Sequence, residues 1–363
     1  MAGRWSPALA LVAALAVGVL LACGAPAAPA APTPALPARA VPTPQPAAPT
    51  AQPPERAQLR VTYGSVSGSM TPLWLAVDQG LFQKYGLSVD VDYAESNAGV
   101  AAVVSGESQV NVNEGVSVIR AIAAGAPLKI VAYFNKRNPY AVVARPEIAT
   151  PADLRGKTIA LLRPGDTTDV SARIALQPRG IVVGADVQAL SAGNSPSRLA
   201  ALLSGQVSAA LLSEAFVDQA VAQGMHVLIS LEQEQIPYVS TATLIADSFG
   251  RDNPNTVRAF LEGMIEAERL FADPSNRALV LPVMAQKLKL DPADPAVADA
   301  YDFYHDRLAR NPRPDREGAE TIIDALREID PAAYATLTPD QVADPSYMDA
   351  IQASGFLDRI WGR

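Results

Sequence analysis

The chain has 363 residues, of which 29 are basic and 37 acidic, so its formal net charge is −8 at pH 7. Lys and Arg form no cluster along the sequence, which argues against nucleic acid or an anionic lipid surface as a partner. The length leaves room for one large or two medium domains with proper cores.

Residues 1–22 have the pattern of a secretory signal peptide. Arg4 precedes an apolar run, Ala8–Leu21, that is too short to span a bilayer comfortably. The only cysteine, Cys23, directly follows a Leu-Leu-Ala sequence. This arrangement resembles the bacterial lipobox, which implies cleavage before Cys23 and a diacylglycerol on its thiol. A chance cysteine near an ordinary cleavage site is the alternative. We expect an extracytoplasmic protein anchored to the bacterial membrane by lipid alone, at the cell surface or in the periplasm.

Residues 23–56 are almost entirely alanine and proline, with a few threonines and glutamines and no hydrophobic period. Proline removes backbone donors and favours the extended polyproline II conformation. We therefore expect a disordered, semi-rigid tether that holds a domain away from a surface.

Residues 57–146 alternate strand-like and helical patterns, as expected for the first part of a first lobe. Pro72 opens a helix at its first position and Gly80 ends it. We predict strands at 59–63, 87–93, 109–112, 128–134 and 140–144, and helices at 72–79, 98–104 and 116–124.

The same order of elements begins again at residue 147 and runs to 239. Ser105-Gly106 matches Ser204-Gly205, and Ala123-Ala124-Gly125 matches Ala222-Gln223-Gly224 at the same offset. The repeat predicts a second, similar α/β lobe, with strands at 157–162, 186–190, 207–212 and 226–231.

Residues 240–363 hold one more strand, at 240–246, and are otherwise helical. Prolines punctuate the predicted helices at 257–271, 276–288, 295–309, 316–328 and 348–360. A tail without further strands cannot build a third sheet, so we expect it to complete the first lobe and pack on it. Two chain crossings would then join the lobes, one near Arg145–Thr150 and one near Ile236–Thr241.

Polar loops follow the predicted strands in both lobes. In open α/β sheets, ligands bind beyond the carboxyl ends of the strands, where helix amides are free. Each polar residue alone could be an ordinary helix cap. As a set they predict a ligand surface between the lobes, made by Ser67, Thr71, Trp74, Ser96, Asn97, Asn113, Glu114, Asp166, Thr167, Thr168, Ser213 and Glu214.

Catalytic and metal-binding patterns are poor by comparison. His226 and His305 have no second His, no Cys and no carboxylate at metal-ligand spacing. The chain lacks a Gly-x-Ser-x-Gly sequence and a phosphate-binding loop ending in Lys-Ser or Lys-Thr. Glu114 and Glu214 could form an acid/base pair, but nothing supplies a nucleophile or an electrophile beside them. We expect binding without cofactor, metal or catalysis.

Several stretches together resemble the NMT1/THI5-like solute-binding proteins of ABC transporters. The first is Pro72-Leu-Trp-Leu-Ala-Val-Asp-Gln-Gly80-Leu-Phe-Gln-Lys-Tyr-Gly86, and Pro151-Ala-Asp-Leu-Arg-Gly156 and Leu203-Ser-Gly205 agree in order and spacing. The resemblance covers roughly Leu59 to Ala246. It implies a two-lobed periplasmic-binding-protein fold (type II) with two hinge crossings. Family members bind nitrate, taurine and other sulfonates, or thiamine pyrimidine precursors.

Two departures from the family bear on function. Glu214 is followed by Ala215 where the family often has proline, and the histidine and cysteine-rich motif of the fungal pyrimidine synthases are absent. The expected cleft loops carry Glu95, Glu114, Asp166 and Glu214 against Arg163 alone. We therefore expect a monomeric solute-binding protein that delivers a small neutral or amine-bearing organic molecule to an ABC permease. A pyrimidine-biosynthesis-type enzyme and a ligand-sensing domain for a membrane receptor remain the alternatives.

Overall fold

The computed structural model describes residues 52–362, apart from the side chains of Glu214 and Ala215. The predicted signal peptide, Cys23 and most of the predicted tether lie outside the described residues. No helix of the described part is long and apolar enough to cross a membrane.

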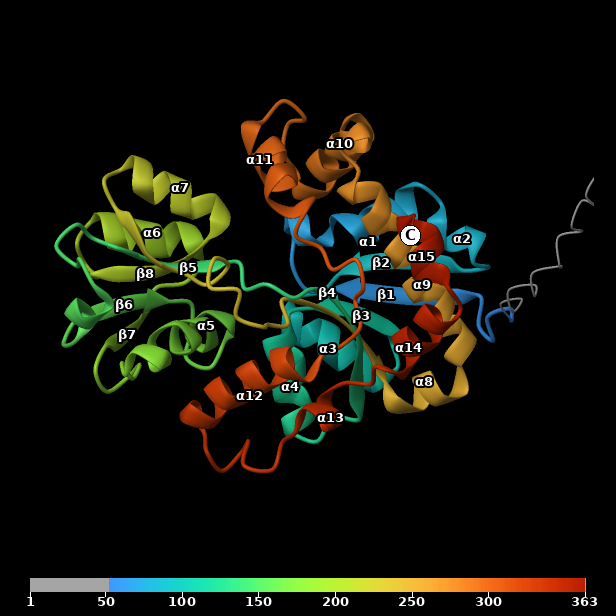
Figure 1. Cartoon of the computed structure of the whole chain (residues 1–363), viewed down its shortest axis with the longest axis horizontal. Coiled ribbons are helices and arrows are strands. Elements are labelled where there is room, and N and C mark those ends of the chain that lie inside the picture. Colours follow the sequence, from blue (N-terminus) through green and yellow to red (C-terminus); the bar gives the residue numbers. More distant parts are fainter. Residues whose placement is uncertain (1–51, 363) are drawn as a thin grey trace, which may run out of the picture. The chain divides into compact units, whose positions relative to one another are not determined.

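Two five-stranded sheets form the frame of the molecule (Figure 1). The first has the order β2-β1-β3-β10-β4 and the second β7-β6-β8-β5-β9. Their strands are β1 (Gln58–Tyr63), β2 (Ser88–Tyr93), β3 (Val110–Asn113), β4 (Leu128–Asn135) and β10 (Thr241–Ala246) in the first sheet, and β5 (Tyr140–Ala144), β6 (Thr158–Leu161), β7 (Gln188–Ser191), β8 (Ala209–Ser213) and β9 (His226–Ser230) in the second.

Both sheets have the same pattern, in which one strand lies between two neighbours and is antiparallel to both. In the first lobe, β1 runs parallel to β2 and β3, and the late strand β10 is antiparallel to both β3 and β4. In the second lobe, β6 runs parallel to β7 and β8, and β5 is antiparallel to both β8 and β9. The structure therefore confirms the predicted two-lobed α/β architecture.

The first crossing between the lobes lies at residues 136–139, before β5, and the second at 231–240. Our sequence-based boundary at 146 placed β5 in the first lobe and the first crossing near Arg145–Thr150, which the pairing of β5 with β8 and β9 contradicts. The two crossings are tied together, because the amide of Tyr238 donates to the carbonyl of Lys136 over 3.1 Å.

Helices follow most strands and cover the sheets. In the first lobe they are the short turn η1 (Gly68–Met70), α1 (Thr71–Asp78), α2 (Leu81–Lys84), α3 (Ser96–Ser105) and α4 (Gly115–Ala123); in the second, α5 (Thr167–Leu176), α6 (Ser195–Leu203) and α7 (Glu214–Ala222). Gly115 begins α4 directly against the second crossing, where a Cβ atom would lie 2.5 Å from the carbonyl oxygen of Val239.

The C-terminal helices pack mainly on the first lobe, as predicted, and Figure 1 shows them around that sheet. Helix α9 packs against α1 and α2, with Phe260 stacked on Phe82 at 5.0 Å between ring centroids. The tail comprises α8 (Asp247–Asp252), α9 (Pro254–Ala272), α10 (Arg277–Leu288), α11 (Pro295–Tyr304), α12 (Arg316–Ile329), α13 (Pro339–Val342), α14 (Ser346–Ala353) and α15 (Phe356–Trp361).

Two tail helices also contact the second lobe. Helix α12 packs against α4 and α5, and Ile119, Ile174 and Ile322 from these three helices belong to one buried apolar cluster. Helix α11 contacts both η1 and α7. The tail therefore bridges the lobes as well as completing the first one.

Candidate functional site

The carboxyl ends of β3 and β8 both lie where the chain crosses between the lobes. Asn113, the last residue of β3, pairs with Ala242 just after the second crossing. Ser213, the last residue of β8, pairs with Tyr140, the first residue after the first crossing. The sheet register therefore brings the strand ends that sequence analysis selected to the interlobe boundary.

Asn113 is fully buried and holds the first-lobe end of the boundary together. Its Nδ2 donates to the carbonyl of Ser96 over 2.9 Å, and its Oδ1 accepts from the amide of Glu114 over 2.8 Å. A Cβ atom at Gly64 would lie 2.2 Å from that same Oδ1, so only glycine leaves room for the Asn113 amide. Asn113 is thus a structural link between β1, β3 and α3, rather than an exposed ligand contact.

Glu114 connects the two lobes. Its Oε2 accepts a 2.6 Å hydrogen bond from the hydroxyl of Thr167, at the start of α5 in the second lobe. Burial raises the pKa of Glu114, the bond from Thr167 partly opposes this, and the nearby negative charge of Asp166 adds to the rise. No other described side chain hydrogen-bonds its carboxylate, which leaves capacity for a ligand.

Asp166 and Thr168, by contrast, are occupied within their own turn. Oδ1 of Asp166 accepts from the amides of Thr168 and Asp169 and from the Thr168 hydroxyl, and its Oδ2 accepts from the amide of Arg163. The Thr168 oxygen also accepts from the amide of Leu162 over 2.8 Å. Asp166 therefore caps α5, and Thr168 ties the start of this helix to the residue that follows β6.

The end of β8 in the second lobe is connected to a buried arginine, Arg198, through Ser195. Ser213 Oγ lies 3.3 Å from Ser195 Oγ, and Ser195 Oγ accepts from Nη2 of Arg198 over 2.7 Å. Arg198 is only 2% exposed and also donates to the carbonyls of Leu211 and Gly193, each over 2.6 Å. Burial lowers the pKa of this guanidinium, and the nearby Tyr140 and Asp166 counteract the decrease.

The loop after β1 is rich in hydroxyls. Ser67 Oγ lies 3.4 Å from Ser65 Oγ and 2.7 Å from Ser69 Oγ, and all three side chains are partly exposed. Gly68 packs under the ring of Tyr304 in α11, where a Cβ atom would come within 2.6 Å of Cδ2. Ser67 thus remains available to a ligand.

Two predicted contacts from the following helix lie in the core. Thr71 and Trp74 are 0% and 1% exposed, and Trp74 packs edge-on against Tyr63 with 5.9 Å between ring centroids. This face of α1 is buried in the core of the first lobe. The hydroxyl of Thr71 and the indole N–H of Trp74 have no hydrogen-bond partner within the described residues, so their place in the ligand surface stays a prediction.

Three predicted ligand contacts remain, namely Ser96, Asn97 and Glu214. Ser96 is partly exposed at the start of α3, with its hydroxyl 3.4 Å from the carbonyl of Gly64, and Asn97 beside it is exposed. Glu214 begins α7, but its side chain lies outside the described residues. The proposed pairing of Glu114 with Glu214 thus stays a prediction.

The structure changes the charge balance that sequence analysis assigned to the cleft. Glu95 is exposed and Asp166 is bonded within its own turn, whereas Arg198 adds a buried positive charge that we missed. One signal was present: Arg198 stands in the first turn of a helix, where the helix dipole disfavours a cation.

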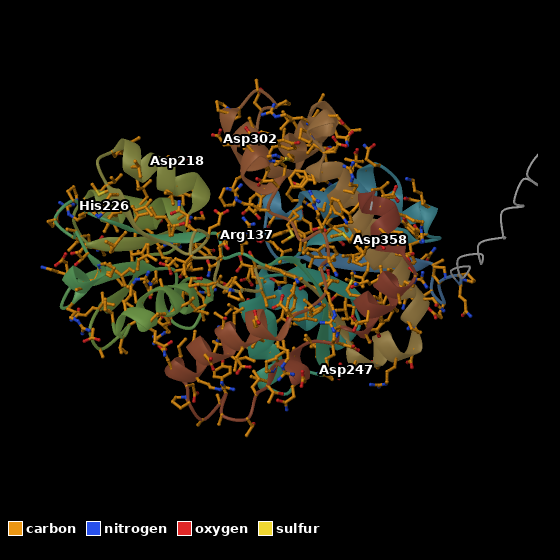
Figure 2. All side chains as sticks on the ribbon, in the orientation of Figure 1. Arg137, Asp218, His226, Asp247, Asp302 and Asp358 are labelled. Carbon is orange, nitrogen blue, oxygen red and sulfur yellow. The ribbon has the colours of Figure 1, made fainter. Side chains whose placement is uncertain are left out.

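Ion pairs connect the two crossings to each other and to the C-terminal part of the chain. Figure 2 labels Arg137 between the two sheets and His226 away from that junction. Arg137 lies 3.8 Å from Glu232 in the other crossing, and Glu232 also pairs with Arg307 at the end of the α11 region. Within residues 52–362, no group of three or more His, Cys, Asp or Glu side chains could hold a metal ion.

Comparisons with known proteins agree with this architecture. A family model described as NMT1/THI5 like matches residues 67–276, whereas no curated protein matches the sequence.

Similar solved structures include the nitrate-binding protein NrtA from Synechocystis PCC 6803 (17% identity, 83% of this chain and 90% of that one, TM-score 0.62). The aliphatic sulphonate binding protein SsuA from Escherichia coli is also similar, with 21% identity, coverage of 79% of this chain and 90% of that one, and a TM-score of 0.60. The Candida albicans CA3427 product, described as having the generic periplasmic binding protein fold, is similar as well. It has 14% identity, coverage of 82% of this chain and 95% of that one, and a TM-score of 0.57. These likenesses support the fold, and the match of the family model over more than half of the sequence shows that the chain belongs to the NMT1/THI5-like family.

Proposed function

We propose that the protein is the solute-binding component of an ABC importer. The observation that carries the proposal is the hydrogen bond between Glu114 and Thr167, which joins the β3 end of one lobe to the α5 start of the other. Family membership and the fold shared with nitrate- and sulphonate-binding proteins support the same function. A solute held between these ends would favour closure, because it contacts both lobes.

The solute in this proposal is a small organic molecule with at least one hydrogen-bond donor. Glu114 has carboxylate capacity left after Thr167, and burying a carboxylate without a full set of partners is costly. An amino or amide group on the solute would supply the missing partner. A monomer then delivers this solute to the transmembrane permease subunits.

Native mass spectrometry of protein purified without refolding tests this function. We expect a small-molecule adduct that is lost after denaturation and that rebinds to the refolded chain. A preparation that carries no adduct, and that binds no compound from an extract of its own host, would contradict solute binding.

Membrane attachment through Cys23 is part of the same proposal. An anchor at Cys23 would keep the binding domain near the permease, with residues 23–56 as the tether. Cys23→Ser should release the protein from membranes or leave the signal peptide uncleaved. If the variant stays in the membrane fraction at the mature mass of the parent, the anchor lies elsewhere.

A further inference from the structure

Arg198 is buried with its charge directed at uncharged acceptors. Among the described residues, it donates to the carbonyls of Leu211 and Gly193 and to the hydroxyl of Ser195. Within residues 52–362, apart from the undescribed side chain of Glu214, no carboxylate lies at ion-pair distance from it, and Asp166 acts on it only through its nearby negative charge. Burying a guanidinium costs free energy, so a residue that only held the loop could have been replaced by a neutral donor at lower cost.

The guanidinium restricts the hydroxyl of Ser195. Arginine only donates hydrogen bonds, so Ser195 Oγ must accept from Nη2 across the 2.7 Å contact. The positive charge repels the hydroxyl proton and directs it away from Arg198. The neighbouring acceptor is Ser213 Oγ, 3.3 Å away. Donation from a charged group also strengthens the next bond along such a chain.

Ser213 then has its own proton left to give. Its hydroxyl makes no capping bond to α7, and it stands at the strand end that pairs with the first residue after the crossing. We propose that Arg198 is a positioning residue that, through Ser195, makes Ser213 a hydrogen-bond donor to the solute. The solute would therefore present an acceptor atom, such as a carbonyl, carboxylate or sulfonate oxygen, to the second lobe.

This assignment rests on the proposed solute-binding function and makes it more specific. Such a solute carries a hydrogen-bond donor that binds Glu114 and, at a separate position, a hydrogen-bond acceptor that binds Ser213. The ordinary alternative is that Arg198 only ties the turn at Gly193 to β8, in which case the direction of the Ser213 hydroxyl would carry no specificity.

Neutron diffraction from deuterium-exchanged crystals of the solute-free protein tests the orientation directly. We expect the Ser195 deuteron to lie toward Ser213 Oγ and the Ser213 deuteron to point elsewhere. A deuteron on Ser213 that points at Ser195 overturns the proposal. This readout needs no solute, so it does not depend on whether the transport function holds.

Binding of two matched probes tests the consequence. MOPS carries a sulfonate, and N-(3-aminopropyl)morpholine has the same skeleton with an amino group in its place. By calorimetry we expect the parent to favour MOPS by at least tenfold. Ser213→Ala and Arg198→Lys should lower this ratio severalfold or more, whereas Ser213→Thr should keep it because the hydroxyl remains. Melting temperatures of all variants report whether folding is intact.

Three results would overturn the assignment. They are a parent that binds both probes equally or neither, a Ser213→Ala variant that keeps the full ratio, and a co-purified solute without an acceptor atom. An adduct in native mass spectrometry combined with any of these would leave the solute-binding function standing and remove only the role of Arg198.

Discussion

The ends of β3 and β8 occupy equivalent places in two sheets of the same topology, yet their chemistry differs. The first-lobe end has Asn113 locked into the backbone and Glu114 bonded to the opposite lobe. The second-lobe end has a pair of serines above a buried arginine. The repeated fold therefore positions the residues at both strand ends. The identity of the residue at each end decides whether that end accepts or donates hydrogen bonds.

The two lobes also differ in what supports these ends. In the first lobe, Gly64 leaves the space that Asn113 fills, and the equivalent position after β6 holds Leu162, whose amide bonds to Thr168 instead. Most of the C-terminal helices pack on the first lobe, and α11 and α12 also contact the second. We expect substitutions at the packed contact between Gly64 and Asn113 to act strongly on stability.

The largest expected effect is that of Gly64→Ala. The added methyl group would overlap Oδ1 of Asn113, which is fully buried and bonded on both of its amide atoms, so neither group can move freely. We expect a loss of about 3 kcal/mol in unfolding free energy, measured by urea denaturation. Adding Asn113→Ala should cost less than the sum of the two single changes. Strict additivity would show that the contact with Asn113 is not the cause.

Glu268 in α9 offers a contrast to Glu114, since it is a buried carboxyl away from the strand ends. Both of its carboxylate oxygens are buried and have no hydrogen-bond partner in the part of the chain that the structure describes, and burial raises its pKa well above the ordinary value. The folded state therefore retains a proton that the unfolded state loses above about pH 4.3, and stability falls as pH rises from there.

Glu268→Gln should stabilise the protein by about 2 kcal/mol at pH 7.5 and by much less at pH 4. Chemical denaturation at the two pH values measures this, with the exposed Glu317→Gln as the matched control. An equal gain at both pH values would mean that ionisation of Glu268 is not responsible.

The next effect concerns the bond between the lobes. Glu114→Gln and Thr167→Val should each weaken binding of the native solute about tenfold, or 1.4 kcal/mol, with little change in the melting temperature of the solute-free protein. Because the pKa of Glu114 is raised and its ionised form binds the donor, affinity should increase as pH rises through that pKa. Calorimetry across pH 5–8 measures both. A parent and a Glu114→Gln variant with the same pH profile would exclude this carboxyl.

The smallest effect lies where the described chain begins. Glu55 accepts bonds from the amides of Asn255 and Thr256 at the start of α9, 200 residues away along the chain. Burial would raise the pKa of Glu55, but these bonds and the Thr256 hydroxyl lower it overall. Glu55→Gln should cost about 0.5 kcal/mol at neutral pH, because the carboxylate is exposed and screened. The cost should vanish as pH falls through the folded-state pKa; a cost that persists at low pH would contradict it.

Sequence patterns predicted the strands and most helices because prolines, glycines and apolar periods mark their ends. They could not show that β5 joins the second sheet, since an apolar run such as Tyr140–Ala144 pairs equally well with the preceding strand. Polar residue type alone likewise could not separate Thr167, which bonds across the lobes, from Thr168, which bonds to Asp166 and Leu162 within its own lobe. Nor could they show that Trp74 is buried, because a helix next to a polar loop has both a core face and a cleft face.

Closure of the two lobes on a solute is most directly tested by small-angle X-ray scattering. The protein is measured with the compound that native mass spectrometry identifies and again after this compound has been removed by unfolding and refolding. We expect a smaller radius of gyration for the loaded protein, because the solute draws the β3 and β8 ends together about the crossings at 136–139 and 231–240. An identical radius at saturation would contradict hinge closure as the way in which this protein holds its solute.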